Sequence, residues 1–332
     1  MRLERSSQTA LQLTCLVLLA ACATGDRTRE DFGALFAPPL QAATPAQVAD
    51  PRAMLGRALF WDVRTSANGR IACASCHEAA DGSADRRRFS IDAKDKPTSR
   101  HSQPIFNAVA QTSLRWTGDR ADAAAQAEGS LTGSMGHPDK AAALAKLKEL
   151  GYEAAFEAAF PGEASPLNAA NYGRALQAYE RTLFTPAAFD RFLAGQDGAL
   201  SPLQKRGLRA FVANGCVACH NGALLGGQQF QKFGVMKDYW TETGSERIDE
   251  GRFLNTRNTA DKYVFRVAML RNVAKTAPYF HDGSVATLDG AVRVMARVQL
   301  GRNLPDDEVG AIVAFLESLT GEVPAHYAAP AR

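Results

Sequence analysis

The sequence contains one five-residue pattern twice, as Cys73-Ala74-Ser75-Cys76-His77 and as Cys216-Val217-Ala218-Cys219-His220. Two thiols three positions apart can bond the two vinyl groups on one edge of a porphyrin, and the adjacent imidazole then binds the iron. The same Cys spacing occurs in thioredoxin-like redox pairs and in half zinc sites. A zinc site would need further ligands at short spacing, and the only later His residues are His281 and His326. The two full matches therefore predict two covalently bound haem c groups.

The first residues predict export. Arg2 and Arg5 precede an apolar run of signal-peptide length, Leu11 to Ala21. Cys22 follows two alanines, an ending that resembles the lipobox of bacterial lipoproteins, in which this thiol would be lipidated and become the mature N-terminus. The alternative is an ordinary secretory signal in which Cys22 is incidental. We expect residues 1–22 to be a lipoprotein signal segment and the protein to be periplasmic, anchored to a membrane only through Cys22.

Composition restricts the class of protein. The 332 residues are enough for two domains, and 38 Lys+Arg nearly balance 35 Asp+Glu. No basic run with interleaved aromatics suggests a nucleic-acid surface, and no apolar run of about 20 residues could span a membrane. Alanine-rich stretches with few β-branched residues point to helices. A polar loop, 81–100, holds the run Arg86-Arg87-Arg88, which is more often a solvated face than a docking site.

Helix signals occur in the same order in both halves. Helices are expected to open at Asp50-Pro51 and at Ser201-Pro202, where an N-cap residue precedes Pro at the first helical position. Further apolar periodicity predicts helices over about 139–150 and 168–184, and a last helix from Asp306 to Gly321. Each half thus runs from a capped helix through Cys-x-x-Cys-His and a long loop to later helices.

This order predicts an all-α fold of two cytochrome c-like haem domains packed across an interface. The expected division is a tether over 23–46, a first haem domain over 47–195 and a second over 196–325.

From about Leu55 to Gly321 the chain resembles the bacterial di-haem cytochrome c peroxidase family, which includes MauG. Several short stretches carry the resemblance: Leu55–Phe60, Arg115–Arg120, Tyr263–Arg266, Leu270–Val273, Ala277–Ser284 and Met295–Gly301. Together they are far more specific than the two haem motifs alone.

The resemblance implies different roles for the two haems. The C-terminal haem would be the high-potential electron entry, with His220 and Met295 as ligands. Met295 also lies on an expected helix 75 residues past His220 (295 − 220), where a thioether ligand is usual in this haem class. The N-terminal haem, held by His77 and the thiols Cys73 and Cys76, would react with peroxide. Trp116 would lie between the haems, and Gln126 matches an active-site glutamine.

The sequence departs from the family at three places. The His that blocks the first iron in reductively activated peroxidases falls at Ala93, so we expect that iron to be open in the ferric protein. The family's distal Glu falls at Gly136, which leaves His137 either as the acid–base residue or as a surface residue before a helix that starts near Pro138. The family's calcium is bound by an Asn and by the carbonyls matching Thr276 and Pro278. The Asn is replaced by His101, a poor ligand for a hard cation, so calcium is either absent or held differently.

These expectations lead to three functions. The first is a peroxidase-type oxidoreductase that reduces hydrogen peroxide with electrons from a small donor, a cytochrome c or a cupredoxin. The second is a MauG-like oxidase that removes electrons from residues of a partner protein. The third is a di-haem electron-transfer cytochrome without peroxide chemistry.

Overall fold

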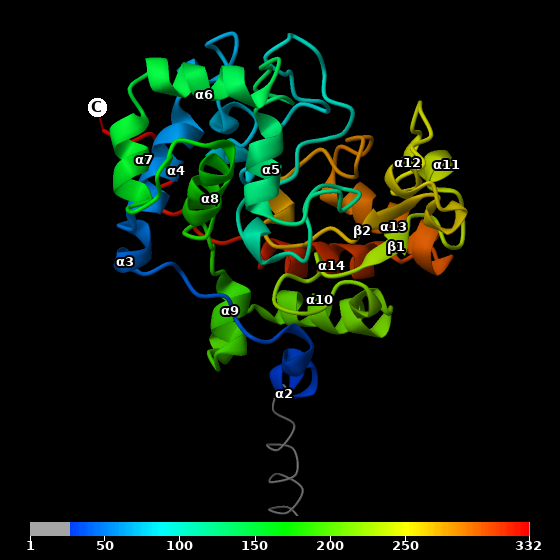
Figure 1. Cartoon of the computed structure of the whole chain (residues 1–332). Coiled ribbons are helices and arrows are strands. Elements are labelled where there is room, and N and C mark those ends of the chain that lie inside the picture. The colour runs from blue at the N-terminus through cyan, green and yellow to red at the C-terminus, as the bar shows by residue number, and fades with distance from the viewer. Residues whose placement is uncertain (1–26, 332) are drawn as a thin grey trace, which may run out of the picture.

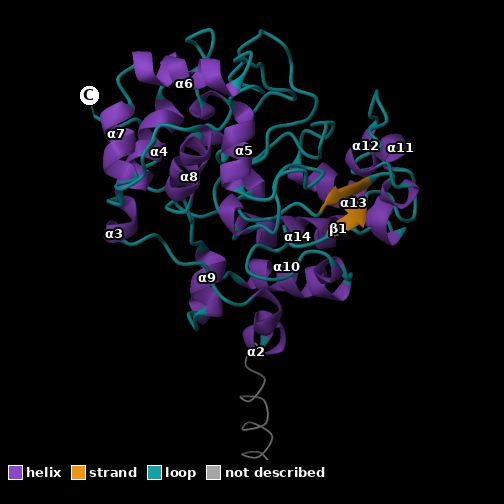
Figure 2. Cartoon of the chain, viewed as in Figure 1, coloured by secondary structure: helices purple, strands orange, loops and turns teal. Residues whose placement is uncertain are grey.

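The structure is a computed structural model that describes residues 27–331. The expected signal segment and Cys22 lie outside the described residues. Helices and connecting loops make up almost all of the described chain, with one short ribbon of two strands (Figure 2). The predicted all-α class is therefore confirmed. No helix in residues 27–331 has the length and apolar character needed to cross a membrane.

The elements follow one another in two series (Figure 1). In the first half the helices are α2 (Thr28–Phe32), α3 (Pro45–Val48), α4 (Pro51–Trp61), α5 (Ala123–Ser130), α6 (Lys140–Glu149), α7 (Glu153–Ala159), α8 (Ala169–Glu180) and α9 (Ala188–Leu193). In the second half they are α10 (Pro202–Ala213), α11 (Tyr239–Thr243), α12 (Phe253–Thr256), α13 (Leu288–Leu300) and α14 (Asp306–Glu317), with strands β1 (Phe230–Lys232) and β2 (Val264–Arg266).

The two predicted helix starts are confirmed with their caps. The Asp50 carboxylate accepts the backbone N–H of Arg52, and Pro51 occupies the first turn of α4. Ser201 and Gln204 form a capping box at the start of α10. Each cap satisfies backbone donors that the first helical turn leaves unpaired, so each motif segment follows a helix with a fixed start.

A close helix crossing of the same kind occurs in each half. In the first, α4 packs on α8, and a Cβ added to Gly56 would lie 2.0 Å from the carbonyl oxygen of Ala175. In the second, α10 packs on α14, and a Cβ at Gly207 would lie 1.9 Å from the carbonyl oxygen of Ala311. Any side chain at these positions would force the helices apart, so the repeat seen in the sequence is also a repeat in packing.

Several polar contacts between the halves come from loops. Arg100 forms a partly buried ion pair with Asp249 (Nε to Oδ2, 2.7 Å). The backbone N–H of His101 donates to the carbonyl of His281 (2.7 Å). The ribbon pairs Phe230 with Arg266 in antiparallel register, and it lies beside α13 on the side of the second domain (Figure 1).

The two ends of the described chain pack on opposite halves. Phe36 is fully buried against Phe189 of α9, in the core that α10 and α14 form. Residues 28–40 are therefore not the free tether that the sequence predicts over 23–46. Tyr327 packs in the first core against Phe60 and Phe106.

The expected division at 195/196 also differs from the cores. Helix α9 contributes Phe189 and Phe192 to the second core, and residues after 325 complete the first. The prediction that Gly321 ends the last helix is wrong. Helix α14 ends at Glu317, and the Gly321 N–H instead donates to Oδ1 of Asn272.

Candidate functional site: two haem-attachment segments and the cavity between them

None of the four motif cysteines forms a disulfide, and each of them is partly buried. Cys73 and Cys216 each open a 3-10 turn, over Cys73–Ser75 and Cys216–Ala218. Burial raises the pKa of Cys73 to about 12 and that of Cys216 to about 11. A reactive redox pair needs a thiol whose pKa is lowered. The raised pKa values of these thiols therefore disfavour the thioredoxin-like alternative. The zinc alternative would need further ligands, and no group of three or more metal-binding side chains occurs within residues 27–331.

Both motif histidines are oriented in the same way. Nδ1–H of His77 donates to the Ser83 carbonyl (2.9 Å), and Nδ1–H of His220 donates to the Leu225 carbonyl (3.1 Å). Burial lowers the pKa of both imidazoles, so both are neutral near pH 7. A ring whose Nδ1–H is engaged by a carbonyl presents the lone pair of Nε2, which is the usual arrangement of a metal-binding His.

A cavity of about 260 Å³ opens beside the second motif. Its walls are mostly apolar, and they include Cys216, Cys219, His220 and Met295. A thiol pair, an imidazole and a thioether around one apolar cavity fit a haem c with His and Met ligands.

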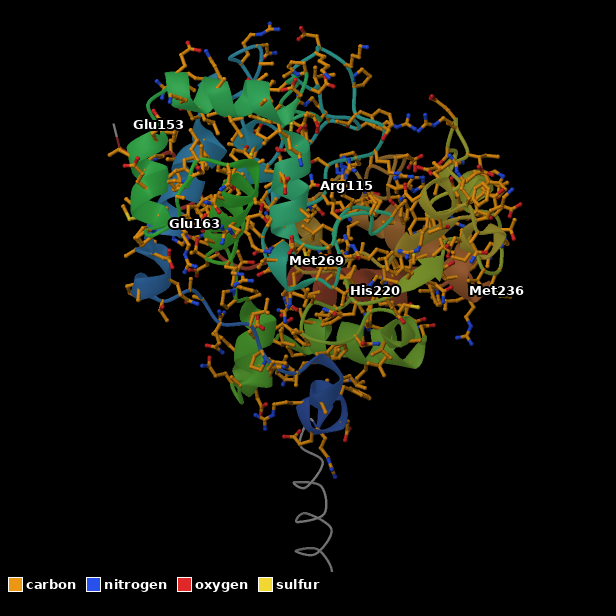
Figure 3. The ribbon with its side chains drawn as sticks, in the orientation of Figure 1. Arg115, Glu153, Glu163, His220, Met236 and Met269 are labelled. Atoms are coloured by element: carbon orange, nitrogen blue, oxygen red, sulfur yellow. The ribbon has the colours of Figure 1, made fainter. Side chains whose placement is uncertain are left out.

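The other methionines separate by position. Met54 and Met236 are each 59% exposed, and Figure 3 shows Met236 at the edge of the molecule, away from His220. Met135 is buried in the first half, in the loop after α5. Met269 also lines the cavity, but its side chain packs into a separate apolar cluster with Leu114 and Leu224. Of the two methionines that line the cavity, Met295 on α13 is the one that lies outside the cluster of Leu114 and Leu224.

Trp116 lies at the same cavity and is held from both halves. Its indole N–H donates to the His101 carbonyl (2.8 Å), and its own carbonyl accepts the Arg266 N–H (2.8 Å). The indole ring meets His281 edge-on with centroids 6.3 Å apart. An aromatic ring is therefore fixed at the junction of the two halves.

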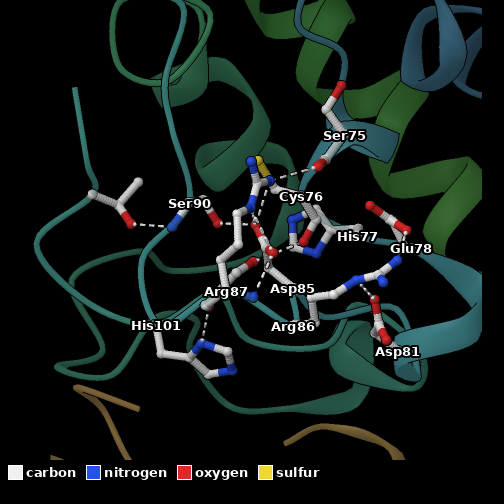
Figure 4. A network of polar contacts seen from close by, with 12 residues as sticks. Ser75, Cys76, His77, Glu78, Asp81, Asp85, Arg86, Arg87, Ser90 and His101 are labelled. Carbon is white, nitrogen blue, oxygen red and sulfur yellow. Dashed lines mark hydrogen bonds and ion pairs between the residues drawn. The ribbon is translucent and has the colours of Figure 1, made fainter. Parts of the chain in front are cut away.

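The arginine run of the polar loop is engaged near the first motif (Figure 4). Arg87 forms a bidentate pair with Asp85, whose carboxylate also accepts the Ser90 hydroxyl (2.7 Å). Arg86 pairs with Glu78 (3.3 Å). The run thus folds the loop around Cys76 and His77 instead of forming a uniform basic surface.

Comparisons with known proteins agree with this geometry. The family model for di-haem cytochrome c peroxidase matches residues 50–198. Cytochrome c551 peroxidase of Pseudomonas aeruginosa is 40% identical over 310 residues, which cover 91% of this chain and 89% of the relative. The chain belongs to the di-haem cytochrome c peroxidase family. It is thereby a member of a family of peroxidase-type oxidoreductases with haem c groups.

Two further relatives show the breadth of the family. Methylamine utilization protein MauG of Methylorubrum extorquens is 30% identical, with 91% of this chain and 89% of the relative covered. The solved structure of a MauG-like protein associated with microbial copper homeostasis superposes with a TM-score of 0.76 at 26% identity, covering 89% of this chain and 97% of that one. The family name thus includes both peroxidases and MauG.

Ala93 and Gly136, at which the sequence analysis expects departures from the family, are neighbours in the structure. The Ala93 N–H donates to the Ser134 carbonyl (2.9 Å), and a Cβ at Gly136 would lie 2.9 Å from the Cβ of Ala93. A small residue on one loop therefore rests on a glycine of the other.

His137 is buried instead of being a surface residue. It is 4% exposed, and its Nε2 is 2.9 Å from the Thr65 carbonyl. A carbonyl only accepts, so Nε2 carries the proton and Nδ1 is left as an acceptor. Helix α6 begins three residues later, with Asp139 as its N-cap.

Gln126 lies on α5, and its Oε1 is buried without a hydrogen-bond partner in the described part of the chain. A buried acceptor without a donor is uncommon in folded proteins. The side chain is thus available to a group that the protein itself does not supply.

The expected calcium ligands lie around an imidazole. His101, Thr276 and Pro278 line the same cavity. Nδ1–H of His101 donates to the Arg87 carbonyl (3.1 Å), and burial lowers the pKa of the ring. A neutral nitrogen donor does not fit a hard cation that prefers oxygen ligands.

Arg266 is the site residue that sequence reasoning did not assign a role. It is buried and lines the cavity with His220 and Met295. The signal that could have identified Arg266 is its position between Phe265 and Val267. The other residues of this short stretch are apolar and fit a buried strand.

Proposed function

We propose that this protein reduces hydrogen peroxide with electrons from a small donor protein, a cytochrome c or a cupredoxin. Family membership supports the peroxide chemistry. The observation that supports an electron-transfer role for the second haem is the cavity beside its motif, because this one apolar space is lined by His220, Met295 and Trp116.

Residues of both halves would hold the haems. Cys73, Cys76 and His77 would hold the first. The thioether pair Cys216 and Cys219, with His220 and Met295 as iron ligands, would hold the second. When bound, the haems supply the iron chemistry, reaction with peroxide at the first and electron transfer at the second. The protein contributes neutral imidazoles and apolar walls.

Trp116 is proposed to connect the two halves electronically. An indole is a polarisable group, and the N–H of this one donates to the His101 carbonyl, while the backbone carbonyl of Trp116 accepts the Arg266 N–H. Trp116→Phe removes the indole N–H and keeps an aromatic ring. We expect peroxide-dependent spectral change at the second haem to slow in this variant. An unchanged rate would remove Trp116 from the route.

Proton transfer is proposed to involve His137 and Gln126. With Nε2–H donating to Thr65, Nδ1 of His137 is the atom that can accept a proton, and Oε1 of Gln126 can accept a hydrogen bond. Splitting peroxide requires that a proton move from one oxygen to the other. If His137→Gln left the rate of peroxide reaction unchanged, the His137 role would fail.

The contact at His101 is proposed to be metal-free. The His101 imidazole already donates to the Arg87 carbonyl, and Thr276 and Pro278 line the same cavity as His101. Metal analysis after dialysis against a chelator, with melting temperature as a second readout, tests this. One equivalent of retained calcium would overturn it.

A MauG-like oxidase is the second candidate, and Ala93 favours it. Without a His at this position, nothing from that loop would need to leave the first iron before reaction. Spin-state spectroscopy of the ferric protein tests the point, because an open iron gives a high-spin signal. Steady turnover with reduced cytochrome c favours the peroxidase. A stable oxidised state that alters a co-purified protein favours the MauG-like role, and no reaction with peroxide leaves the electron-transfer cytochrome.

A periplasmic location with a lipid on Cys22 is proposed from the N-terminal sequence. Mass spectrometry of the mature N-terminus tests it, since a diacylated Cys22 and an unmodified Ala23 start differ in mass.

A further inference from the structure

Arg266 and Arg271 are both buried, yet they differ in what faces them. Arg271 is fully buried, and its guanidinium forms a bidentate pair with Asp190 at 2.7 and 3.0 Å. Arg266 is 2% exposed and forms no ion pair with any carboxylate of residues 27–331. One buried guanidinium is therefore neutralised by the protein, and the other is not.

The contacts of Arg266 are all with neutral oxygens. Nε donates to the Arg115 carbonyl (3.2 Å), and Nη2 donates to Oε1 of Gln103 (3.1 Å). Nη1 donates to Oε1 of Gln111 and, at 3.5 Å, to the Val267 carbonyl. A guanidinium has five N–H donors, so these four bonds leave one donor of Nη2 without an acceptor. Burial lowers the pKa of Arg266 only to about 10, so the group stays cationic near neutral pH.

An uncompensated charge in this position is costly. Moving a cation from water into a protein interior costs several kcal/mol even after relaxation, unless an opposite charge meets it. Neutral amide and carbonyl oxygens satisfy hydrogen bonds but do not cancel the charge. Within residues 27–331 no side chain supplies the counter-charge, so we look for it in a bound group.

The cavity indicates where that counter-charge comes from. Arg266 lines the same space as Cys219, His220 and Met295, and this space fits a haem. A haem carries two carboxylates on the edge opposite its vinyl groups, and a guanidinium binds a carboxylate through paired N–H donors.

We propose that Arg266 binds a carboxylate of the haem held by His220. The inference rests on the assignment of that cavity to a haem and not on the reaction with peroxide. The same residue bonds the Trp116 carbonyl through its backbone N–H. Arg266 would thus contact the haem carboxylate through its side chain and Trp116 through its backbone, at the junction of the two halves. It is a charged positioning residue.

Charge gives this role a measurable signature. A cation beside the haem favours the reduced state, which carries one positive charge less than the oxidised state. Arg266→Gln should shift the midpoint potential of the second haem downward and leave that of the first nearly unchanged. Arg266→Lys, which keeps the charge but loses the planar fork, should shift it less.

The matched control is Arg252→Gln. Arg252 also lies beside the ribbon, where its backbone N–H bonds the Val264 carbonyl, but its side chain pairs with Asp261 (3.8 Å) and stacks over Phe230. Arg252 does not line the cavity, so Arg252→Gln should leave the midpoint potentials of both haems unchanged.

Spectroelectrochemical titration of each variant, with haem content measured in parallel, tests the proposal without peroxide. An Arg266→Gln protein that holds two haems with the wild-type second potential overturns it. If that variant does not fold, the crystal structure of the haem-loaded wild type decides. We expect a carboxylate oxygen of the second haem within about 3.2 Å of an Arg266 nitrogen. Carboxylates bound elsewhere would refute the assignment. Loss of peroxide turnover alone bears on the proposed function and not on this contact.

Discussion

The buried pair of Asp190 and Arg271 offers a sharp test of how the second domain is held. Its carboxylate accepts both Arg271 bonds and also the backbone N–H of Leu40 (2.6 Å) and of Ala187 (2.7 Å). Nε of Arg271 in turn donates to the Ala223 carbonyl (2.8 Å), in the loop after His220. The perturbation is Asp190→Asn, which keeps the shape but removes the charge and turns one acceptor into a donor.

The expected loss of unfolding free energy follows from the contacts that the Asp190 carboxylate makes. Breaking a buried ion pair by neutralising one partner costs about 3–5 kcal/mol, because the other charge stays buried and unpaired. The matched control is Asp289→Asn, since Asp289 pairs with Arg293 at 2.8 Å but is 52% exposed. A surface pair of this kind contributes about 0–1 kcal/mol.

Denaturant unfolding followed by far-ultraviolet circular dichroism measures both variants. A loss of about 3–5 kcal/mol corresponds to roughly a 150- to 4,000-fold change in the folding equilibrium. Because Arg271 also anchors the loop that orients His220, the visible spectrum of the second haem should change at lower denaturant than that of the first. An Asp190→Asn protein as stable as Asp289→Asn would refute the reasoning.

Three further predictions concern single side chains. Met295→Ala should convert the second haem to high spin while mass spectrometry still finds two haems, whereas Met54→Ala, at an exposed position, should change neither. Burial raises the pKa of Glu180 to about 8 from 4.5, so the folded protein keeps a proton that the unfolded chain releases. Stability should therefore fall as pH rises from about 5 to 8, and Glu180→Gln should flatten this slope in unfolding curves; equal slopes would contradict it. His137→Ala should cost about 1–3 kcal/mol in unfolding free energy, because it leaves the buried Thr65 carbonyl without its donor; a variant as stable as wild type would count against that bond.

Features with local causes could be predicted from the sequence. The starts of α4 and α10 depend on Asp50 and Ser201 with the adjacent prolines, and those contacts span only two or three residues. The motif histidines could likewise be predicted, because each directly follows a Cys-x-x-Cys pair. Their hydrogen bonds to Ser83 and Leu225 were not, because no pattern marks which carbonyl a loop will present.

Features that depend on distant parts of the chain could not be predicted. Gly321 reads as a helix stop, yet its N–H bonds Asn272, 49 residues away. His137 reads as a residue before a helix, yet it is buried through Thr65, 72 residues away. Arg266 reads as one charge in an apolar segment. Only the packed structure shows that no carboxylate of the described chain reaches it.

The exchange of chain ends between the two cores has a consequence for biosynthesis. Polypeptides emerge N-terminus first, so the early helices α4, α7 and α8 are made long before Tyr327, which fills the space between Phe60 and Phe106. The first core therefore stays open until synthesis is nearly over. A chain cut before residue 324 should therefore fail to close the first core, although it already contains all the helices of that core.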